Sequence, residues 1–429
     1  MKLRDFQIED GATIAKVRSA LVAHEPRVGK TGITIHAANL LRAKIFVVVC
    51  PAGVKDNWRK AIEVFRVGQW IAIIVSYNKA NEVLKVLRNS RMRICVLVVD
   101  ESQYCKERSA NRTRVIYGPM CDGLGGLAEF ADHVYCLTGT PMPNNPTELW
   151  PMLRALAPHL IDNGRGKPMS WSSFRDRYCK QIQTPYGVKI IGGKNYKELK
   201  DKLKTFVLRR TRASVFGRDL LPPTTVYVRA EASHKSELAA LSNSAAGLLV
   251  KQALGSANPL KMLAKAEKQA ASLRKLFGIA KVPGILRLVA EELDIEPREK
   301  IVLFAYHHAV IDALRIGLKK YGAVAFDGRT SPDRKVAINK KFLSDSTCRV
   351  MIGQISAAGV GLDFSAANNV LFAEQDWVGD NNEQARSRIF NMASLDPKFT
   401  RFAVLLGSMD EQIAMACARK MSDFKKIFA

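Results

Sequence analysis

The sequence of 429 residues lacks several features that would assign it to a special class of protein. No apolar run reaches the roughly 18 residues that a membrane-spanning helix requires, and the start MKLRDFQIED resembles neither a secretory nor a transit peptide. The eight cysteines are scattered, and no two have the Cys-x-x-Cys spacing typical of zinc and redox sites. We therefore expect a soluble intracellular protein in a reducing compartment, without a membrane segment, disulfides or zinc.

Acidic residues are scarce relative to basic ones. The chain has 40 Asp and Glu against 66 Lys and Arg, which gives a formal net charge of +26 and a pI near 9.8. The excess is spread along the chain, which predicts a polyanionic partner, above all nucleic acid. A merely basic surface is the alternative that composition leaves open. The apolar fraction of 47% and the charged fraction of 25% are those of a globular protein.

Short apolar runs alternate with helical stretches in two separate parts of the chain, which predicts an α/β fold with two parallel sheets. The expected strands are residues 45–50, 70–76, 94–99, 134–138, 301–304, 323–326, 349–352, 369–372 and 402–406. The expected domains are a first lobe at residues 1–230, with a helical and basic insertion near 150–205, a helical protrusion or linker at 231–285, and a second lobe at 286–429.

A phosphate-binding loop is the first chemical signal, at residues 24–31. Gly29 comes directly before Lys30, where a glycine lets the backbone approach phosphate oxygens and the following helix offers its first N–H groups. Lys30 would contact the β- and γ-phosphates of ATP, and the hydroxyl of Thr31 would bind Mg²⁺. His24 and Arg27 stand where glycines often lie, so an ordinary loop containing Gly-Lys-Thr is the alternative that this segment alone leaves open.

Two adjacent acids follow an apolar run in Val98-Val99-Asp100-Glu101-Ser102-Gln103. Mg²⁺ prefers one or two carboxylates together with phosphate oxygens, and hydrolysis needs a group that orients water. Asp100 suits the metal and Glu101 suits the water. A solvated turn is the alternative, but a Gly-Lys-Thr loop upstream in the same predicted sheet favours catalysis.

Many segments, in order, resemble motifs of superfamily-two helicases and, within them, of the Swi/Snf-type translocases. Asp100-Glu101-Ser102-Gln103 resembles the Asp-Glu-x-x box of that family. The other similar segments of the first half are Leu3-Arg4-Asp5-Phe6-Gln7, Val48-Val49-Cys50-Pro51 with Asn57-Trp58, Leu137-Thr138-Gly139-Thr140-Pro141, Pro143-Asn144-Asn145-Pro146-Thr147-Glu148-Leu149-Trp150, Phe174-Arg175-Asp176-Arg177-Tyr178-Cys179 and Leu208-Arg209-Arg210-Thr211 with Leu221-Pro222-Pro223. Those of the second half are Ala357-Ala358-Gly359-Val360-Gly361-Leu362-Asp363, the segment from Glu374 to Trp377 followed by Glu383-Gln384-Ala385-Arg386-Ser387-Arg388, and Gly407-Ser408-Met409-Asp410-Glu411-Gln412-Ile413.

The resemblance implies two RecA-like lobes, ATP with Mg²⁺ in the cleft, and DNA across both lobes. It assigns adenine recognition to Gln7 and nucleotide binding to Arg27, Gly29, Lys30, Thr31, Gly361 and Asp363, with Lys30, Asp100, Glu101 and Arg388 as catalytic residues and Thr31 and Asp100 as metal ligands. Expected contacts to DNA phosphates are Lys55, Asn57, Thr140, Arg329, Thr330 and Ser356, and they should be largely independent of sequence. The nearest subgroup is the compact, annealing-helicase-like kind that acts on duplex or branched DNA.

The sixth motif departs from the family pattern Gln-x-x-x-Arg-x-x-Arg. From Gln384 the pattern places arginines at 388 and 391, but residue 391 is an asparagine. Asparagine carries no charge and cannot replace a guanidinium, and Arg386 lies two residues from Arg388, so on a helix the two would diverge. We therefore expect Arg388 to carry the charge that reaches the γ-phosphate, and turnover to be slow.

These observations predict an ATP-dependent DNA translocase, a DNA-stimulated ATPase of replication, repair or recombination. A strand-separating DNA or RNA helicase and a low-turnover, nucleotide-gated DNA-binding protein remain as alternatives. We expect a monomeric, minimal motor of viral or mobile-element origin.

Three further features leave alternatives open or carry no site. Trp377 fits either the core or base stacking, and the basic helix at residues 194–204 fits either a solvated face or a DNA contact. His307-His308 on a strand does not predict a metal site.

Overall fold

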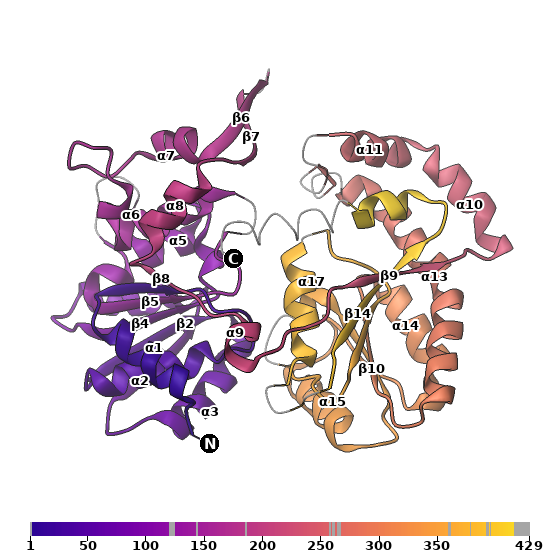
Figure 1. Cartoon of the computed structure of the whole chain (residues 1–429), viewed down its shortest axis with the longest axis horizontal. Coiled ribbons are helices and arrows are strands. Elements are labelled where there is room, and N and C mark those ends of the chain that lie inside the picture. The colour runs from indigo at the N-terminus through magenta and orange to yellow at the C-terminus, as the bar shows by residue number, and fades with distance from the viewer. Residues whose placement is uncertain are drawn as a thin grey trace. The chain divides into compact units, whose positions relative to one another are not determined.

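The computed structural model describes residues 2–119, 125–142, 145–184, 187–256, 259, 262–263, 267–358, 362–377, 379–391, 394 and 396–415. The chain forms two compact units: unit 1 contains Met1–Arg218, and unit 2 contains Asp219–Asp423 (Figure 1). Each unit is built around its own sheet of six strands.

All neighbouring strands in the sheet of unit 1 are parallel. Their spatial order is β3 (Ile71–Ser76), β2 (Ile45–Cys50), β4 (Ile94–Asp100), β5 (Ala131–Leu137), β1 (Ser19–Val22) and β8 (Val207–Leu208). Successive residues of β2 enter different clusters: Phe46 and Val48 pack on one face, Val47 and Val49 on the other. Because both faces are buried, the strands are continuous apolar runs rather than alternating ones.

Helices cover both faces of this sheet (Figure 1). One face packs against α1 (Asp5–Ala15), α2 (Lys30–Leu40) and α3 (Lys55–Phe65). The other packs against α4 (Ala80–Arg88), α5 (Asn111–Tyr117), α6 (Trp150–Leu156), α7 (Trp171–Tyr178) and α8 (Tyr196–Leu203). A hairpin of β6 (Cys179–Thr184) and β7 (Gly187–Gly193) and the short α9 (Arg212–Phe216) complete the unit.

The sheet of unit 2 is also parallel throughout. Its order is β11 (Val324–Phe326), β12 (Val350–Gln354), β10 (Ile301–Ala305), β13 (Asn369–Phe372), β14 (Phe399–Leu405) and β9 (Thr224–Val228). Its helices are α10 (Ala232–Ser242), α11 (Ala245–Leu254), α13 (Glu267–Ile295), α14 (His308–Gly317), α15 (Pro332–Ser344), α16 (Ile355–Ala358) and α17 (Gly379–Arg386). The core includes residues of α11, α13 and α14 packed against the sheet.

The predicted fold class, two parallel α/β lobes with a helical segment between the predicted sheets, is confirmed. The domain boundaries differ from the sequence-based ones. Residues 219–230 belong to unit 2, because β9 pairs with β14. The predicted boundary at 285 falls inside α13, whose buried residues join the core of unit 2.

Within the described residues, the cysteines are free thiols and no helix is suited to span a membrane. Cys50, Cys95, Cys105, Cys136, Cys179 and Cys348 are free thiols, and Cys121 and Cys417 lie outside the described residues. No helix in the described ranges is long and apolar enough to cross a membrane.

Candidate nucleotide site

Three predicted motifs follow three adjacent strands of unit 1 at the same level. Val22 at the end of β1 pairs with Leu137 at the end of β5, and Leu137 pairs with Asp100 at the end of β4. Neighbouring parallel strands lie about 4.8 Å apart, so the phosphate loop and the acid pair leave the sheet within about two strand spacings. The carboxyl edge of this sheet is therefore the candidate nucleotide site, as is usual for open parallel sheets.

The phosphate loop enters α2 at Gly29, which has φ 76°. A side chain there would also displace Gln7, since a Cβ would lie 2.4 Å from its Nε2. That Nε2 donates to the carbonyl oxygen of Gly29 at 3.0 Å, so the glutamine expected to recognise adenine contacts the loop itself. Lys30 and Thr31 form the first turn of α2, and Nζ of Lys30 donates to the carbonyl oxygen of His24 at 2.9 Å and to that of Glu25 at 3.3 Å.

Arg27 adopts the left-handed conformation, with φ 72°. Non-glycine residues are uncommon there, and glycine has no penalty. At this position the backbone thus has a conformation that glycine adopts without penalty, although the sequence has an arginine.

The third motif packs against the phosphate loop. A Cβ on Gly139 would lie 3.0 Å from the ring of Pro26, so glycine permits this close approach. Thr140 is buried, with 4% of its surface exposed, and its amide donates to Oγ1 of Thr138 at 2.9 Å. In this conformation Thr140 supports the edge from inside and does not offer a surface contact for DNA.

Asp100 is held by neutral donors. The indole Nε1 of Trp58 donates to Oδ2 at 2.8 Å, and the amide of Glu101 donates to Oδ1 at 3.0 Å. Burial, and next the negative charge of Glu101, raise the pKa of Asp100, while the indole and the positive charge of Lys30 act in the opposite direction. The raised pKa shows that burial and the neighbouring Glu101 disfavour the ionised carboxylate, which a bound cation would stabilise.

Glu101 is the second strained residue of the edge, with φ 53°. Its carboxylate accepts from Nε2 of Gln103 at 2.7 Å, and its carbonyl oxygen accepts from the Tyr77 hydroxyl at 3.3 Å. Strained backbone persists where the surroundings fix it and clusters at functional sites. The carboxylate is half-buried and fixed in direction.

Several buried polar atoms at this edge have no hydrogen-bond partner within the described part of the chain: Oγ of Ser102, Oε1 of Gln103 and Oγ1 of Thr140. Buried polar groups are nearly always paired, so each exception asks for an explanation. All three belong to the second and third motifs, and a bound ligand or water would satisfy them.

The sequence assigned no role to two residues that the structure brings to this edge. The sequence identifies Trp58 only as part of the Asn57-Trp58 segment, yet its indole donates to Asp100 and orients it. The Tyr77 hydroxyl donates to the carbonyl oxygens of both Asp100, at 2.7 Å, and Glu101. A tryptophan early in an amphipathic helix is ordinarily core, so its pattern alone carries no signal for the second role.

In unit 2 the fifth and sixth motifs lie together. The amide of Phe364, next to Asp363, donates to the carbonyl oxygen of Arg388 at 3.1 Å. Asp363 is half-buried, and its amide donates to Oδ1 of Asn339 at 3.1 Å. Gly361 lies outside the described residues.

The two arginines of the sixth motif differ sharply. Arg386 ends α17 with 5% of its surface exposed, and its Nε donates to Glu383 at 2.5 Å. Arg388 lies in the following 3₁₀ turn, Ser387–Ile389, and is half-buried. At three residues per turn the two side chains leave the axis about 240° apart, so Arg386 is committed to internal packing and Arg388 is the better candidate for a ligand.

The predicted DNA contacts differ in accessibility. Lys55 and Asn57 lie in the first turn of α3, half-buried and exposed respectively, and Ser356 on α16 is exposed. Thr330 is half-buried, and its hydroxyl accepts from the amide of Asp327 at 3.1 Å.

Arg329, also a predicted DNA contact, is shared by two carboxylates. Its Nη2 lies 2.5 Å from Asp327 and 3.0 Å from Asp312. This arginine can bind a phosphate only by releasing at least one carboxylate. It is the least suited of the predicted contacts that lie at the surface.

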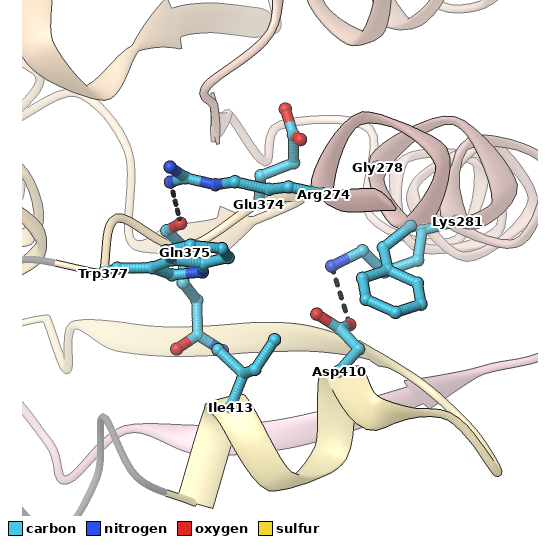
Figure 2. A pocket seen from close by; sticks show the side chains of 9 residues that line it. Arg274, Gly278, Lys281, Glu374, Gln375, Trp377, Asp410 and Ile413 are labelled. Atoms are coloured by element: carbon cyan, nitrogen blue, oxygen red, sulfur yellow. Dashed lines mark hydrogen bonds and ion pairs between the residues drawn. The ribbon is translucent and has the colours of Figure 1, made fainter. Parts of the chain in front are cut away.

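A pocket in unit 2 lies between α13 and the loop that follows β13 (Figure 2). The Arg274 guanidinium lies 4.6 Å from the centroid of Trp377 and 3.6 Å from that of Tyr306, and its Nη2 donates to the carbonyl oxygen of Gln375 at 2.8 Å. Trp377 is 5% exposed. Because Arg274 covers its ring, the structure supports the core interpretation of Trp377 over base stacking.

The paired histidines lie elsewhere than expected. β10 ends at Ala305, and His307 and His308 form the cap and first residue of α14. Nδ1 of His307 lies 2.6 Å from Glu374, and Nδ1 of His308 lies 3.1 Å from Asp327. Each ring therefore meets a different carboxylate.

Comparison with known proteins identifies two family profiles. The SNF2-related domain matches residues 66–275, and the helicase conserved C-terminal domain matches residues 284–392. A SWI/SNF-related matrix-associated actin-dependent regulator of chromatin subfamily A-like protein 1 homolog from Caenorhabditis elegans is 26% identical over 91% of this chain and 56% of its own length. The DNA annealing helicase and endonuclease ZRANB3 of Bos taurus is 26% identical over 95% of this chain and 39% of its own.

The chain thus spans about half the length, or less, of these curated relatives. Among solved structures, the Sulfolobus solfataricus SWI2/SNF2 ATPase core in complex with dsDNA aligns with 100% of this chain and 93% of its own, at 19% identity and a TM-score of 0.43.

Proposed function

Because the chain belongs to the SNF2-related, helicase-like family, we propose that it is a DNA-stimulated ATPase that couples ATP hydrolysis to movement along DNA. The observation that carries the proposal is the register of unit 1, which brings the phosphate loop, Asp100 and the third motif to adjacent strand ends.

In the proposed mechanism the first turn of α2 binds the phosphates through its amide groups, with Lys30 on the β- and γ-phosphates. Thr31 and Asp100 would hold Mg²⁺, a hard cation that suits a hydroxyl and a carboxylate. When bound, the metal neutralises charge on the phosphates. Glu101 orients the attacking water, and Gln103 and the strained backbone keep its carboxylate in place.

We propose that Arg388 stabilises charge on the transferring phosphate, as arginines do in related phosphoryl transfers. The internal ion pair of Arg386 with Glu383 supports this choice between the two. Asn391 offers no charge, so turnover is slow compared with a motor that uses two arginines.

The proposed partner is DNA, bound through its phosphates. The net charge of +26 and the accessible Lys55, Asn57 and Ser356 support this choice. The names of the relatives describe chromatin regulators and an annealing helicase, which favours remodelling or annealing of DNA over strand separation. Branched DNA as the preferred substrate is part of the proposal.

The test is phosphate release with and without duplex DNA, together with triplex displacement and fork unwinding. Displacement of a triplex strand without fork unwinding is the expected result. Unwinding of forks would indicate instead that the protein is a strand-separating helicase.

A second candidate is a nucleotide-gated DNA-binding protein with little turnover, favoured by Asn391 at the position of the second arginine of the sixth motif. It predicts DNA affinity that changes with bound nucleotide although DNA does not stimulate phosphate release. That outcome would rule out the proposed translocase in favour of this binding protein.

A further inference from the structure

The residue that departs from the phosphate-loop pattern at its start, His24, is fully buried and bonded at both ring nitrogens. Nε2 lies 2.8 Å from Oδ2 of Asp10 on α1, and Nδ1 accepts from the amide of Arg210 at 3.1 Å. Because Nδ1 accepts an N–H, the proton of the neutral ring is on Nε2 and is donated to Asp10.

Asp10 is shared between the histidine and an arginine. It is 1% exposed and accepts from Nε and Nη2 of Arg210, both at 2.7 Å. Such a two-point pair between guanidinium and carboxylate fixes direction as well as distance. Burial opposes ionisation of Asp10, but the hydrogen bonds from His24 and Arg210 outweigh it and lower its pKa.

The peptide unit that joins His24 to Glu25 links this cluster to the catalytic lysine. Its N–H, on Glu25, donates to the carbonyl oxygen of Arg210 at 3.0 Å, and its C=O, on His24, accepts from Nζ of Lys30 at 2.9 Å. In a planar trans peptide the N–H and C=O point in opposite directions. When Arg210 fixes the N–H, the carbonyl is therefore aimed at Lys30.

We propose that Arg210, Asp10 and His24 are positioning residues for Lys30. Arg210 contacts the cluster three times: its amide reaches the His24 ring, its carbonyl reaches the peptide unit, and its guanidinium reaches Asp10. The three residues set the plane from which Lys30 is presented to the phosphates. This inference rests on the proposed nucleotide site.

The neighbourhood offers a matched control. Glu9 also accepts from Nη2 of Arg210, at 2.7 Å, but its side chain is 69% exposed. Its carboxylate pairs with Arg210, whereas that of Asp10 contacts both Arg210 and His24. Glu9→Gln therefore removes a carboxylate from the same arginine without disturbing the histidine. A general loss of charge balance around Arg210 would affect both Glu9→Gln and Asp10→Asn, whereas the proposed role affects only the latter.

The experiment measures binding of a fluorescent ATP analogue, and the rise in unfolding temperature that nucleotide produces, in the full chain. His24→Ala and Asp10→Asn should each weaken nucleotide binding about 10-fold or more, the effect of a lost hydrogen bond to a charged group. The double variant should be little worse than either single one, since both break the same chain of contacts. Glu9→Gln should bind like the parent, and His24→Gln, whose amide can still donate to Asp10, should recover part of the affinity.

A purely structural role gives a different pattern. The unfolding temperature without nucleotide would fall in His24→Ala and Asp10→Asn, while affinity and the nucleotide-induced rise remained those of the parent; this result would overturn the inference. Equal losses in Asp10→Asn and Glu9→Gln would overturn it as well. If the parent itself binds no nucleotide, the proposed function fails and the inference fails with it, whereas parent-like binding in the variants removes the inference alone.

Discussion

Asp100 is the last residue of β4 in unit 1, and Asp327 directly follows β11 in unit 2, but their electrostatic surroundings are opposite. Burial and Glu101 raise the pKa of Asp100, whose hydrogen-bond donors are an indole and an amide. The Arg329 guanidinium lowers the pKa of Asp327 to about 2. The carboxylate in unit 2 is neutralised within the protein, and the one in unit 1 is not.

The same contrast holds for Glu101 but not for every carboxylate of unit 1, since Glu25 pairs with Arg209 and Arg212, and Asp10 pairs with Arg210. In unit 2, Glu374 meets His307, Glu383 meets Arg386 and Asp410 meets Lys281. In unit 1, Glu101 accepts from an amide of Gln103. A carboxylate without a fixed counter-charge costs stability and suits a charged ligand, so the comparison supports the edge of unit 1 as the proposed site for metal and nucleotide.

The largest expected effects test the chemistry of unit 1. Lys30→Ala should abolish hydrolysis by weakening nucleotide binding. Glu101→Gln should reduce hydrolysis by at least about 10²-fold, the usual contribution of a positioned base, while ATP still binds. Phosphate release and nucleotide binding, measured side by side, separate the two defects, and activity in Glu101→Gln within twofold of the parent would remove the assignment of the water-orienting residue.

The next effect separates the two arginines of unit 2. Arg388→Ala should lower DNA-stimulated turnover by about 10³-fold with nucleotide binding retained, as for other arginines that act on the transferring phosphate. Arg386→Ala should instead destabilise the fold, because it removes a buried guanidinium together with its ion pair to Glu383. Steady-state kinetics and denaturant unfolding distinguish them; the reverse pattern would mean that the register of the sixth motif is wrong. Asn391→Arg should raise turnover or leave it unchanged.

Neutralising one acid in each unit should change stability in opposite directions. In buffer with a metal chelator, Asp100→Asn should raise the unfolding temperature, since it removes a buried charge, while Asp327→Asn should lower it by breaking the pairs with Arg329 and His308. Each kcal/mol corresponds to about 3 °C for units of this size. Shifts of the same sign in the two variants would contradict the comparison.

A smaller effect concerns backbone strain in the phosphate loop. Arg27→Gly should stabilise the protein by about 1 kcal/mol, because glycine adopts a positive φ without penalty. If the guanidinium also contacts phosphate, as the sequence predicts, nucleotide affinity should fall although stability rises. Thermal unfolding and nucleotide binding give the two readings, and a loss of stability would show that the left-handed conformation carries no strain here.

The smallest effect compares Lys55 and Arg329, two of the DNA contacts that the sequence predicts. The logarithm of DNA affinity should fall linearly with the logarithm of salt concentration, by about 0.9 for each phosphate neutralised. Lys55→Ala should reduce that slope by about 0.9, the contribution of one phosphate. Arg329→Ala should leave the slope nearly unchanged, because the guanidinium is already paired with Asp312 and Asp327. A parent slope near zero between about 50 and 200 mM salt would contradict phosphate binding altogether.

Much of the fold follows from local pattern. The apolar runs at residues 45–50, 94–99 and 369–372 coincide with β2, β4 and β13 to within one residue, because a strand buried on both faces must be apolar throughout. The two-residue β8 and the half-exposed β9 lack that signal. Without β9, the sequence could not indicate that residues 219–230 belong to the second sheet.

By itself the sequence determined the parallel sheets and the absence of an arginine at 391. It also determined that Lys30 lies at the start of a helix, and Asp100 and Glu101 at the end of a strand. These are properties of short stretches, since periodicity and motif chemistry act over a few residues. Tertiary structure alone decided that Trp58 orients Asp100, that Thr140 is buried, that Arg386 and Arg329 are neutralised, and that His24 is held by Asp10 and Arg210. His24 and Arg210 are 186 residues apart and meet only because β1 and β8 are neighbours in the sheet; whether a charged side chain is free or paired depends on such neighbours, which no local pattern specifies.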